Sequence, residues 1–85
     1  MVVASLKVSR SDRNATLIRI GIEIRRRRQK LDIPQIALAA KAREFMSNVI
    51  GRTERGKYDP SVLTLDAIAA ALNTSMVDLL RGAFR

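Results

Sequence analysis

Residues 34–56 read PQIALAAKAREFMSNVIGRTERG and contain two short helical segments with a brief polar interruption between them. Pro34 suits the first turn of a helix, and the apolar residues that follow recur at helical spacing as far as Ala42. A second helix is predicted from residue 46 or 47 to residue 55, and Gly56 is typical of the position that ends a helix. Two short helices joined by a tight turn therefore lie at the centre of the fold.

A basic amphipathic helix is predicted ahead of this segment, over residues 15–31. Its apolar positions fall at helical spacing with arginines and lysines between them, and they are Leu17, Ile20, Ile24 and Leu31. Asn14 or Ser11 can cap its start, and Pro34 ends it because proline disfavours the helical conformation at the residue before it. Residues 1–13 form a basic N-terminal arm, which is either flexible or a short strand.

Two further helices are predicted after the central segment, over residues 62–72 and 76–81. Ser61 caps the first, Asn73 ends it in a left-handed conformation, and its inward positions are Leu65, Ile68, Ala69 and Leu72. The second begins at a capping box of Ser75 and Asp78 and is closed by Gly82. No segment alternates between apolar and polar residues, so we expect an all-α, compact five-helix domain over residues 14–82, followed by a short tail at residues 83–85.

The charge of the chain is strongly positive and unevenly distributed. With 85 residues the chain forms one small domain, and its 16 Lys and Arg against 8 Asp and Glu give a net charge of +8. The first 31 residues carry nine basic residues against two acidic ones, so +7 of this charge lies there. A hydrophobic content of 47% is too high for a disordered basic tail. Attraction to an acidic polymer or surface is therefore expected.

Several function classes are disfavoured by residue types that the chain lacks. It has neither Cys nor His, so disulfides, thiolate nucleophiles, histidine bases and the usual zinc or iron sites are not expected. The eight carboxylates are scattered without a nucleophile–base pair, so we expect no enzyme, no cofactor and no metal. There is no run of 18 apolar residues and no secretory signal at the start, so we expect no membrane contact and a cytoplasmic location.

Two short helices around a tight turn, the second with small polar residues on one side, form a helix-turn-helix arrangement. Beyond that arrangement, an ordered set of residues extends from Gly21 to Gly82: Ile24-Arg25, Arg28, Gln35, Leu38-Ala39, Ile50, Glu54-Arg55-Gly56-Lys57, Pro60-Ser61, Leu65, Ile68-Ala69, Ala71-Leu72, Ser75 and Leu79-Leu80. In this order and spacing, the set resembles the Cro/repressor-type helix-turn-helix family, also called XRE-like. The resemblance implies a lambda-repressor-like fold and a DNA-binding transcriptional regulator, such as a restriction–modification controller or a mobile-element regulator.

The sequence departs from the family pattern at three places. The interval from Gln35 to Glu54 is 19 residues, one more than is usual, and the extra residue falls at Arg43-Glu44. The turn there lacks glycine, so we expect it to be longer and differently shaped. Arg27 stands where the family has a core leucine, so its stem is expected to pack while its head reaches water. Thr53 replaces a larger apolar residue, and its hydroxyl can bond to the carbonyl four residues earlier.

The resemblance assigns base reading to the exposed side of the second central helix. Its candidate base contacts are Ser47, Asn48, Val49 and Arg52. Asparagine pairs with adenine and arginine with guanine in the major groove, and a valine can meet a thymine methyl group. Ser47 has an alternative role as the cap of this helix.

The same resemblance assigns contacts to the DNA backbone and one structural ion pair. The candidate phosphate contacts are Gln35, Arg55, Lys57, Arg25 and Arg43. For the arginines of the run at residues 25–28, a solvated basic face is the alternative. Arg28 and Glu54 are implied to form a partly buried pair that sets the angle of the recognition helix, the alternative being two separately solvated charges.

The C-terminal helix and tail carry apolar residues that the core does not all need. Met76, Val77, Leu80 and Phe84 are the predicted homodimer interface. A two-fold dimer suits a palindromic operator on double-stranded DNA. The alternative function is a protein-interaction module on the same fold, an antitoxin or antiactivator that sequesters a protein partner.

Overall fold

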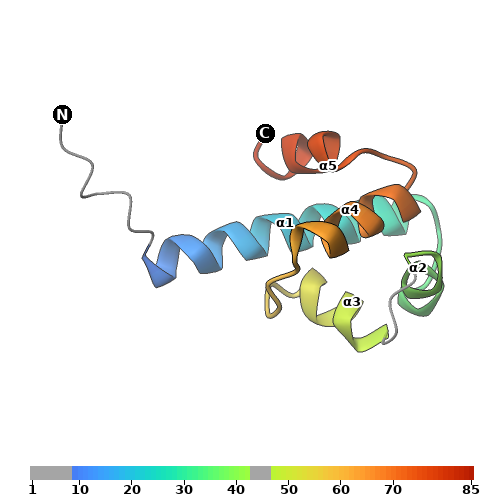
Figure 1. Ribbon diagram of the computed structural model, residues 1–85, viewed down its shortest axis with the longest axis horizontal. Helices are drawn as coiled ribbons and strands as arrows, with labels where there is room; N and C mark the ends of the chain where they lie inside the picture. The colour runs from blue at the N-terminus through green and yellow to red at the C-terminus, as the bar shows by residue number, and fades with distance from the viewer. Residues whose placement is uncertain (1–8, 43–46) are drawn as a thin grey trace.

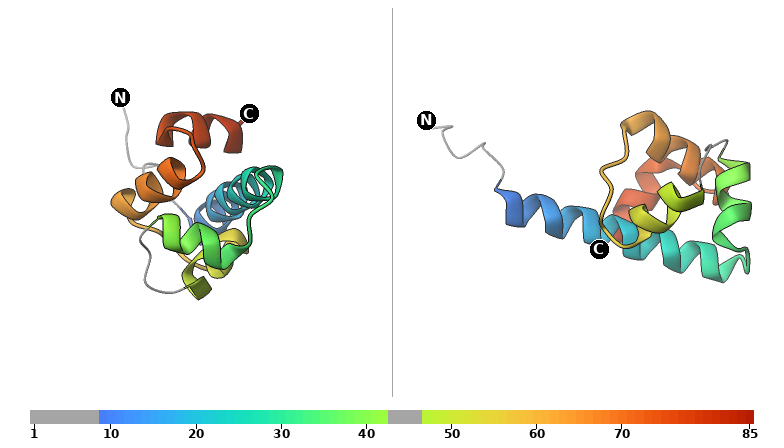
Figure 2. Two further views of the ribbon diagram at one scale, coloured as in Figure 1. Left: turned by 90° about the vertical axis from the view of Figure 1, so that its right-hand side faces the viewer. Right: turned by 90° about the horizontal axis from the view of Figure 1, so that it is seen from below.

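The computed structural model describes residues 9–42 and 47–85, which form five α-helices and no strand. The helices are α1 (Arg10–Lys30), α2 (Gln35–Lys41), α3 (Ser47–Glu54), α4 (Val62–Ala71) and α5 (Met76–Ala83). Helix α1 runs along the length of the molecule, with α5 on one side and the α2–α3 pair on the other (Figures 1 and 2). The predicted all-α, five-helix class is confirmed.

The core is built from the positions that helical spacing predicted. The inward residues of α2, α3 and α4 are all buried: Leu38, Ala39, Ala42, Ile50, Leu65, Ile68, Ala69 and Leu72. In α1, Ile20 and Ile24 are buried and Leu17 is half-buried. Leu31 is 38% exposed, because it follows the last turn of α1 and lies at the edge of the core.

Helix α1 begins five residues earlier than predicted, at Arg10. The hydroxyl of Ser9 accepts a hydrogen bond of 3.1 Å from the Asp12 amide, so Ser9 is the cap, and neither Asn14 nor Ser11 has that role. Asp12 also favours the helix start through its charge. These first turns project beyond the body of the molecule and bury nothing, so no apolar stripe marked them (Figure 1). Residues 10–13 are thus helical, and the rest of the predicted arm, residues 1–8, lies outside the described residues.

The prediction that Gly82 ends α5 is wrong, because the helix continues to Ala83. Gly82 faces α1, and a Cβ atom at this position would collide with the Glu23 carboxylate. The glycine therefore serves close helix packing. The C-terminal tail is correspondingly one residue shorter than the predicted tail.

Two glycines also fix α3 against α1. A Cβ atom on Gly21 of α1 would lie 2.6 Å from the Glu54 carbonyl oxygen and even closer to that of Thr53. Gly56 follows α3 with φ of 72° and sits over Ile18 of α1. Only glycine allows both contacts, so these positions set how closely the last turn of α3 approaches α1.

Candidate nucleic-acid interface

Helix α3 is held against α1 by a nearly buried ion pair. Arg28 Nε lies 2.6 Å from Glu54 Oε2, and a second Arg28 nitrogen donates to Glu54 Oε1 at 3.1 Å. The two side chains are only 12% and 2% exposed. Arg28 also donates to the Ile33 carbonyl at 2.9 Å, which ties the α1–α2 connection to the same guanidinium. The pair implied by the resemblance therefore sets the direction in which α3 presents its outer face.

Asn48 and Arg52 form the exposed side of α3. They are four residues apart and therefore share a face, whereas Ile50 and Thr53 are buried on the opposite side. The Arg52 guanidinium lies over the Tyr58 ring at 5.4 Å from its centroid, and this contact orients it beside the outer surface. The structure thus offers a side-chain amide and a guanidinium on one accessible helix face.

Val49 does not belong to this face. It is 7% exposed, so little of its surface can reach a groove, and we remove it from the candidate base contacts. Its carbonyl accepts a 2.6 Å hydrogen bond from the Thr53 hydroxyl, as the spacing of these residues predicted. Ser47 is the first residue of α3, but its side chain lies outside the described residues, as does all of Arg43.

Gln35 and Arg55 come together above Gly51. A Cβ atom on Gly51 would lie 3.1 Å from the Gln35 side-chain oxygen and 3.3 Å from an Arg55 guanidinium nitrogen. Gln35 Nε2 donates to Glu54 Oε1 at 3.0 Å, so this amide also joins the start of α2 to the end of α3. Sequence reasoning missed this bridging role, because the contact spans 19 residues and depends on how the helices cross.

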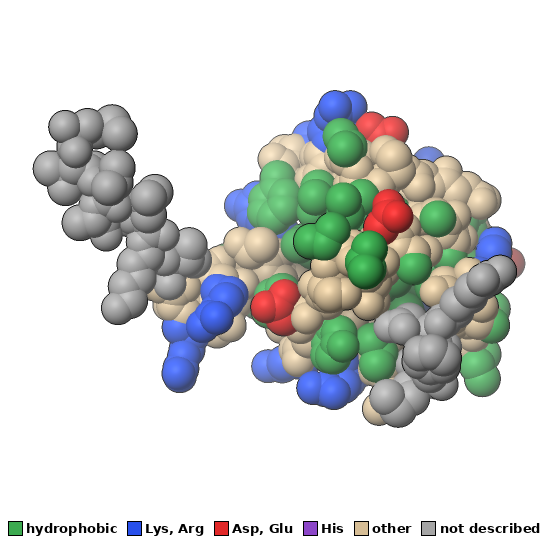
Figure 3. All heavy atoms as spheres, viewed as in Figure 1, with side chains coloured by type: hydrophobic (Ala, Val, Ile, Leu, Met, Phe, Trp, Pro, Cys, Tyr) green, Lys and Arg blue, Asp and Glu red, His purple; other side chains and the backbone are tan. Residues whose placement is uncertain are grey.

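The remaining candidate phosphate contacts lie on the same side of the molecule. Arg25 is exposed and lies one turn from both Gly21 and Arg28, each of which contacts α3. Lys57 is exposed in the loop that follows α3. Lysine and arginine side chains gather on the projecting part of α1 and along the edge formed by α3 and the loop after it (Figure 3). This edge is a basic surface around the exposed face of α3.

Besides Arg28, two more arginines of the run at residues 25–28 are paired within the fold, and sequence reasoning did not foresee these two pairs. Glu23 is 5% exposed and pairs with Arg26 at 2.6 Å and with Arg27 at 2.7 Å. The hydrogen bond from Arg26 is the main cause that lowers the pKa of the Glu23 carboxyl, against the opposing effect of its burial. The Arg27 side chain is 23% exposed, and its head, which was expected to reach water, pairs with Glu23 and donates to the Asp78 carbonyl at 3.2 Å, so that it links α1 to α5. The spacing of Glu23 from both arginines was the available sequence signal.

The predicted interface residues of the C-terminal helix divide into two groups. Met76 and Leu80 are partly buried and pack against the core. Val77 is 61% exposed, and Phe84 is 46% exposed with the Arg19 guanidinium 5.9 Å from its ring centroid. Val77 and Phe84 are therefore the members of this set that offer apolar surface to another molecule.

A sequence model described as helix-turn-helix matches residues 24–79, which is more than half of the chain. The chain belongs to the Cro/repressor-type helix-turn-helix family. Among solved structures, this helix-turn-helix protein is similar to the restriction-modification controller protein C.AhdI from Aeromonas hydrophila, with 26% identity and a TM-score of 0.73. That similarity covers 76% of this chain and 97% of C.AhdI. A search of curated protein sequences gave no match.

This helix-turn-helix chain is accordingly a DNA-binding regulator. Across residues 9–42 and 47–85, no group of three or more acidic, Cys or His side chains is placed to hold a metal ion. Among the described helices, none is by itself long and apolar enough to cross a bilayer, and α4 and α5 reach that threshold only as a pair bent by 93°.

Proposed function

We propose that this protein is a sequence-specific repressor or controller of transcription that binds double-stranded DNA through α3 in the major groove. The observation that carries the proposal is the division of α3 into two faces. One face is locked to α1 through Glu54 and Arg28. The other presents Asn48 and Arg52 to solvent, with side chains that pair bidentately with adenine and guanine.

Affinity in this proposal comes from the basic edge around α3, and discrimination comes from α3 itself. Gln35, Arg55, Lys57 and Arg25 contact phosphates, and Arg43 extends the same set. Such contacts position a protein on the duplex without reading sequence. Ser47 keeps its two proposed roles, as a base contact or as the cap of α3.

The test is binding of operator and random DNA by an Arg52→Ala variant. Loss of a bidentate base contact should weaken operator binding by about 1–3 kcal/mol and relax one base position, with little change on random DNA. Arg81→Ala is a matched control, because Arg81 is an exposed arginine of α5 that pairs with Asp78. Equal losses on operator and random DNA would contradict base reading by Arg52.

We also propose that the regulator acts in the cytoplasm as a homodimer on a palindromic operator. Val77 and Phe84, with the partly buried Met76 and Leu80, are the proposed interface on α5. Sedimentation of the wild type should give a dimer, and Val77→Asp should give a monomer with unchanged helix content. A wild type that is monomeric both free and on DNA would contradict this part.

A second candidate function is supported by apolar surface outside α5. Ile36 of α2 is 68% exposed, and Leu63 of α4 is 82% exposed. Exposed apolar patches mark protein-binding surfaces, so an antitoxin or antiactivator that sequesters a protein partner remains the alternative proposal. A gel shift with DNA from its own promoter separates the two, since a sequestering module need not retard that DNA.

A further inference from the structure

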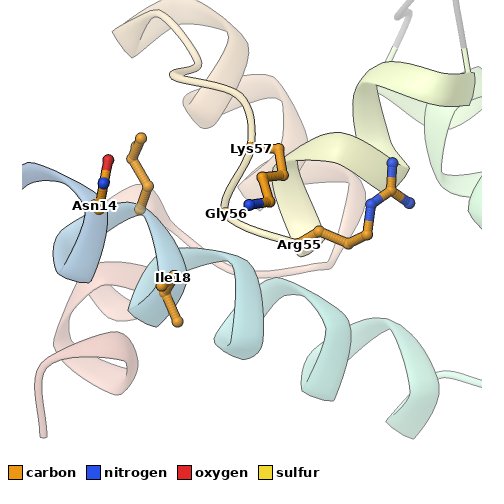
Figure 4. A pocket seen from close by; sticks show the side chains of 6 residues that line it. Asn14, Ile18, Arg55, Gly56 and Lys57 are labelled. Atoms are coloured by element: carbon orange, nitrogen blue, oxygen red, sulfur yellow. The ribbon is translucent and has the colours of Figure 1, made fainter.

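A groove lies between the projecting half of α1 and the loop that follows α3. Its volume is about 310 Å³, and it is lined by Asn14, Leu17, Ile18, Arg55, Gly56 and Lys57 (Figure 4). The α1 wall of this groove precedes residue 24, where the match to the helix-turn-helix family begins. The groove therefore lies partly outside the segment that the family model matches.

The loop is held down on α1 by its glycine. Gly56 has φ of 72°, and a Cβ atom at this position would collide with the Ile18 side chain, so the loop and α1 are in contact at this point. Lys57 follows immediately, and its ammonium lies close to Gly56, whereas the Arg55 guanidinium extends away from α1 (Figure 4). Lys57 is thus a basic residue of the groove lining whose side chain stays beside the loop.

The groove combines hydrogen-bond donors with an apolar floor. The Asn14 side chain stands on α1, across the groove from Lys57 (Figure 4), and Leu17 and Ile18 are the apolar residues of the lining. Within the described ranges, Lys57 has no acidic partner, and the nearest acid along the chain, Asp59, does not line the groove. An ammonium and an amide NH₂ that face one space can both donate to a single anionic oxygen group.

We propose that this groove holds a phosphodiester group of the DNA backbone, with Asn14 and Lys57 as its donors. The proposal rests on the proposed function and adds a contact beyond the helix-turn-helix. Lys57 is anchored in the loop directly after α3, so a duplex seated on α3 brings its backbone to this loop. A phosphate held here carries no base information and contributes affinity alone.

The projecting turns of α1 continue the same contact surface. Arg10, Asn14, Leu17 and Gly21 share one face of the helix, and Gly21 touches α3. The distance from Gly21 to Arg10 along the helix is about 16 Å at 1.5 Å per residue. Arg10 is therefore about three turns of α1 away from the contact with α3, on the helix face that it shares with Asn14.

The test compares Asn14→Asp with Thr16→Asp on operator and on random DNA of equal length. Both variants lower the net charge by one, and both sites are exposed in the projecting part of α1. Residue 16 lies about 160° around the helix from Ile18 and so faces away from the groove. Circular dichroism checks that helix content is unchanged.

We expect Asn14→Asp to weaken binding about tenfold on both DNAs and to make the salt dependence shallower by about one phosphate. Thr16→Asp should weaken binding less than threefold. Equal losses of DNA affinity in the two variants, or unchanged affinity in Asn14→Asp, would overturn the proposed phosphate site while leaving the proposed function intact. A wild type that binds no DNA would overturn the proposed function, and the proposed phosphate site would fall with it.

Neutral methylphosphonates locate the contacted phosphate. Replacing phosphates one at a time should reveal one position in each half-site at which wild type and Asn14→Asp bind equally well. A difference between the two proteins that persists at every position would also overturn the proposal.

Discussion

Replacing Glu54 by glutamine tests how α3 is held in place. The Glu54 carboxylate is 2% exposed and accepts hydrogen bonds from two Arg28 nitrogens and from Gln35. Glu54→Gln keeps the size of the side chain but removes its charge and turns an NH₂ group toward these donors. Arg28 then stays charged and largely buried without a counterion.

The cost follows from the number and kind of bonds lost. Hydrogen bonds to charged groups contribute about 1.5–3 kcal/mol each, and two of them join Arg28 to Glu54. Breaking a buried ion pair costs about 3–5 kcal/mol, which agrees with this sum. We therefore expect Glu54→Gln to lower the free energy of unfolding by about 3–5 kcal/mol. An 85-residue domain has about 4–13 kcal/mol in total, so the loss is a large fraction of it.

The assay is urea unfolding followed by circular dichroism, with two comparison variants. Arg81→Met breaks an exposed pair whose side chains are 67% and 55% exposed, and it should cost less than about 1 kcal/mol. Combining Arg28→Met with Glu54→Leu leaves no buried charge and should cost less than Glu54→Gln alone. A loss below about 1 kcal/mol for Glu54→Gln, or a double variant that costs the sum of its single changes, would refute the reasoning.

Three further outcomes follow from individual contacts. Gly51→Ala should leave the free energy of unfolding unchanged or raise it by up to about 1 kcal/mol, because the added Cβ displaces only the ends of two flexible side chains. It should weaken DNA binding, because those side chains, Gln35 and Arg55, are proposed phosphate contacts. Urea unfolding and gel shifts measure the two effects. Gly21→Ala should cost about 3 kcal/mol or more in urea unfolding, because its Cβ meets backbone carbonyls of α3 that cannot move aside. The folded-state pKa of Glu23 lies below its ordinary value of 4.5, so the unfolded chain binds the proton more readily and stability falls as the pH drops below about 5. When the pH is lowered from about 6 to about 3.5, the urea concentration at the midpoint of unfolding should therefore fall less for Glu23→Gln than for the wild type. An equal fall in both proteins would contradict the stabilising role of the Glu23 carboxylate.

Most helix positions could be predicted because helical spacing is a local property of the chain. The buried faces of α2 and α4 match the predicted inward positions. Leu38 and Ala42 are four residues apart, and Leu65, Ile68 and Leu72 follow one another at intervals of three and four, as expected where a helix packs on a core. The start of α1 was missed for the same reason, because its first turns pack on nothing and show no such interval. Gly82 was misread because a glycine that permits close packing looks the same in sequence as one that ends a helix.

The candidate site could be predicted only in part. Asn48 and Arg52 share the exposed face that the resemblance assigned to them, whereas Val49 is buried although it is adjacent to Asn48. Neighbouring positions on a helix differ by 100° in direction, so the way in which α3 packs on its neighbours decides which of them reaches solvent. Sequence spacing narrows the outer face to a few residues but does not define its edge.

The sequence by itself determined the family, the order of the helices and the positive charge, because each depends on residue types and their spacing along the chain. The tertiary structure decided how that charge is used. It links Arg27 of α1 to the Asp78 carbonyl of α5, joins Gln35 to Glu54, and sets Lys57 beside a groove walled by Asn14. Most of these arrangements bring together groups far apart in the chain, and their distances depend on how closely glycines let the helices cross. Such distances exist only once the helices have packed.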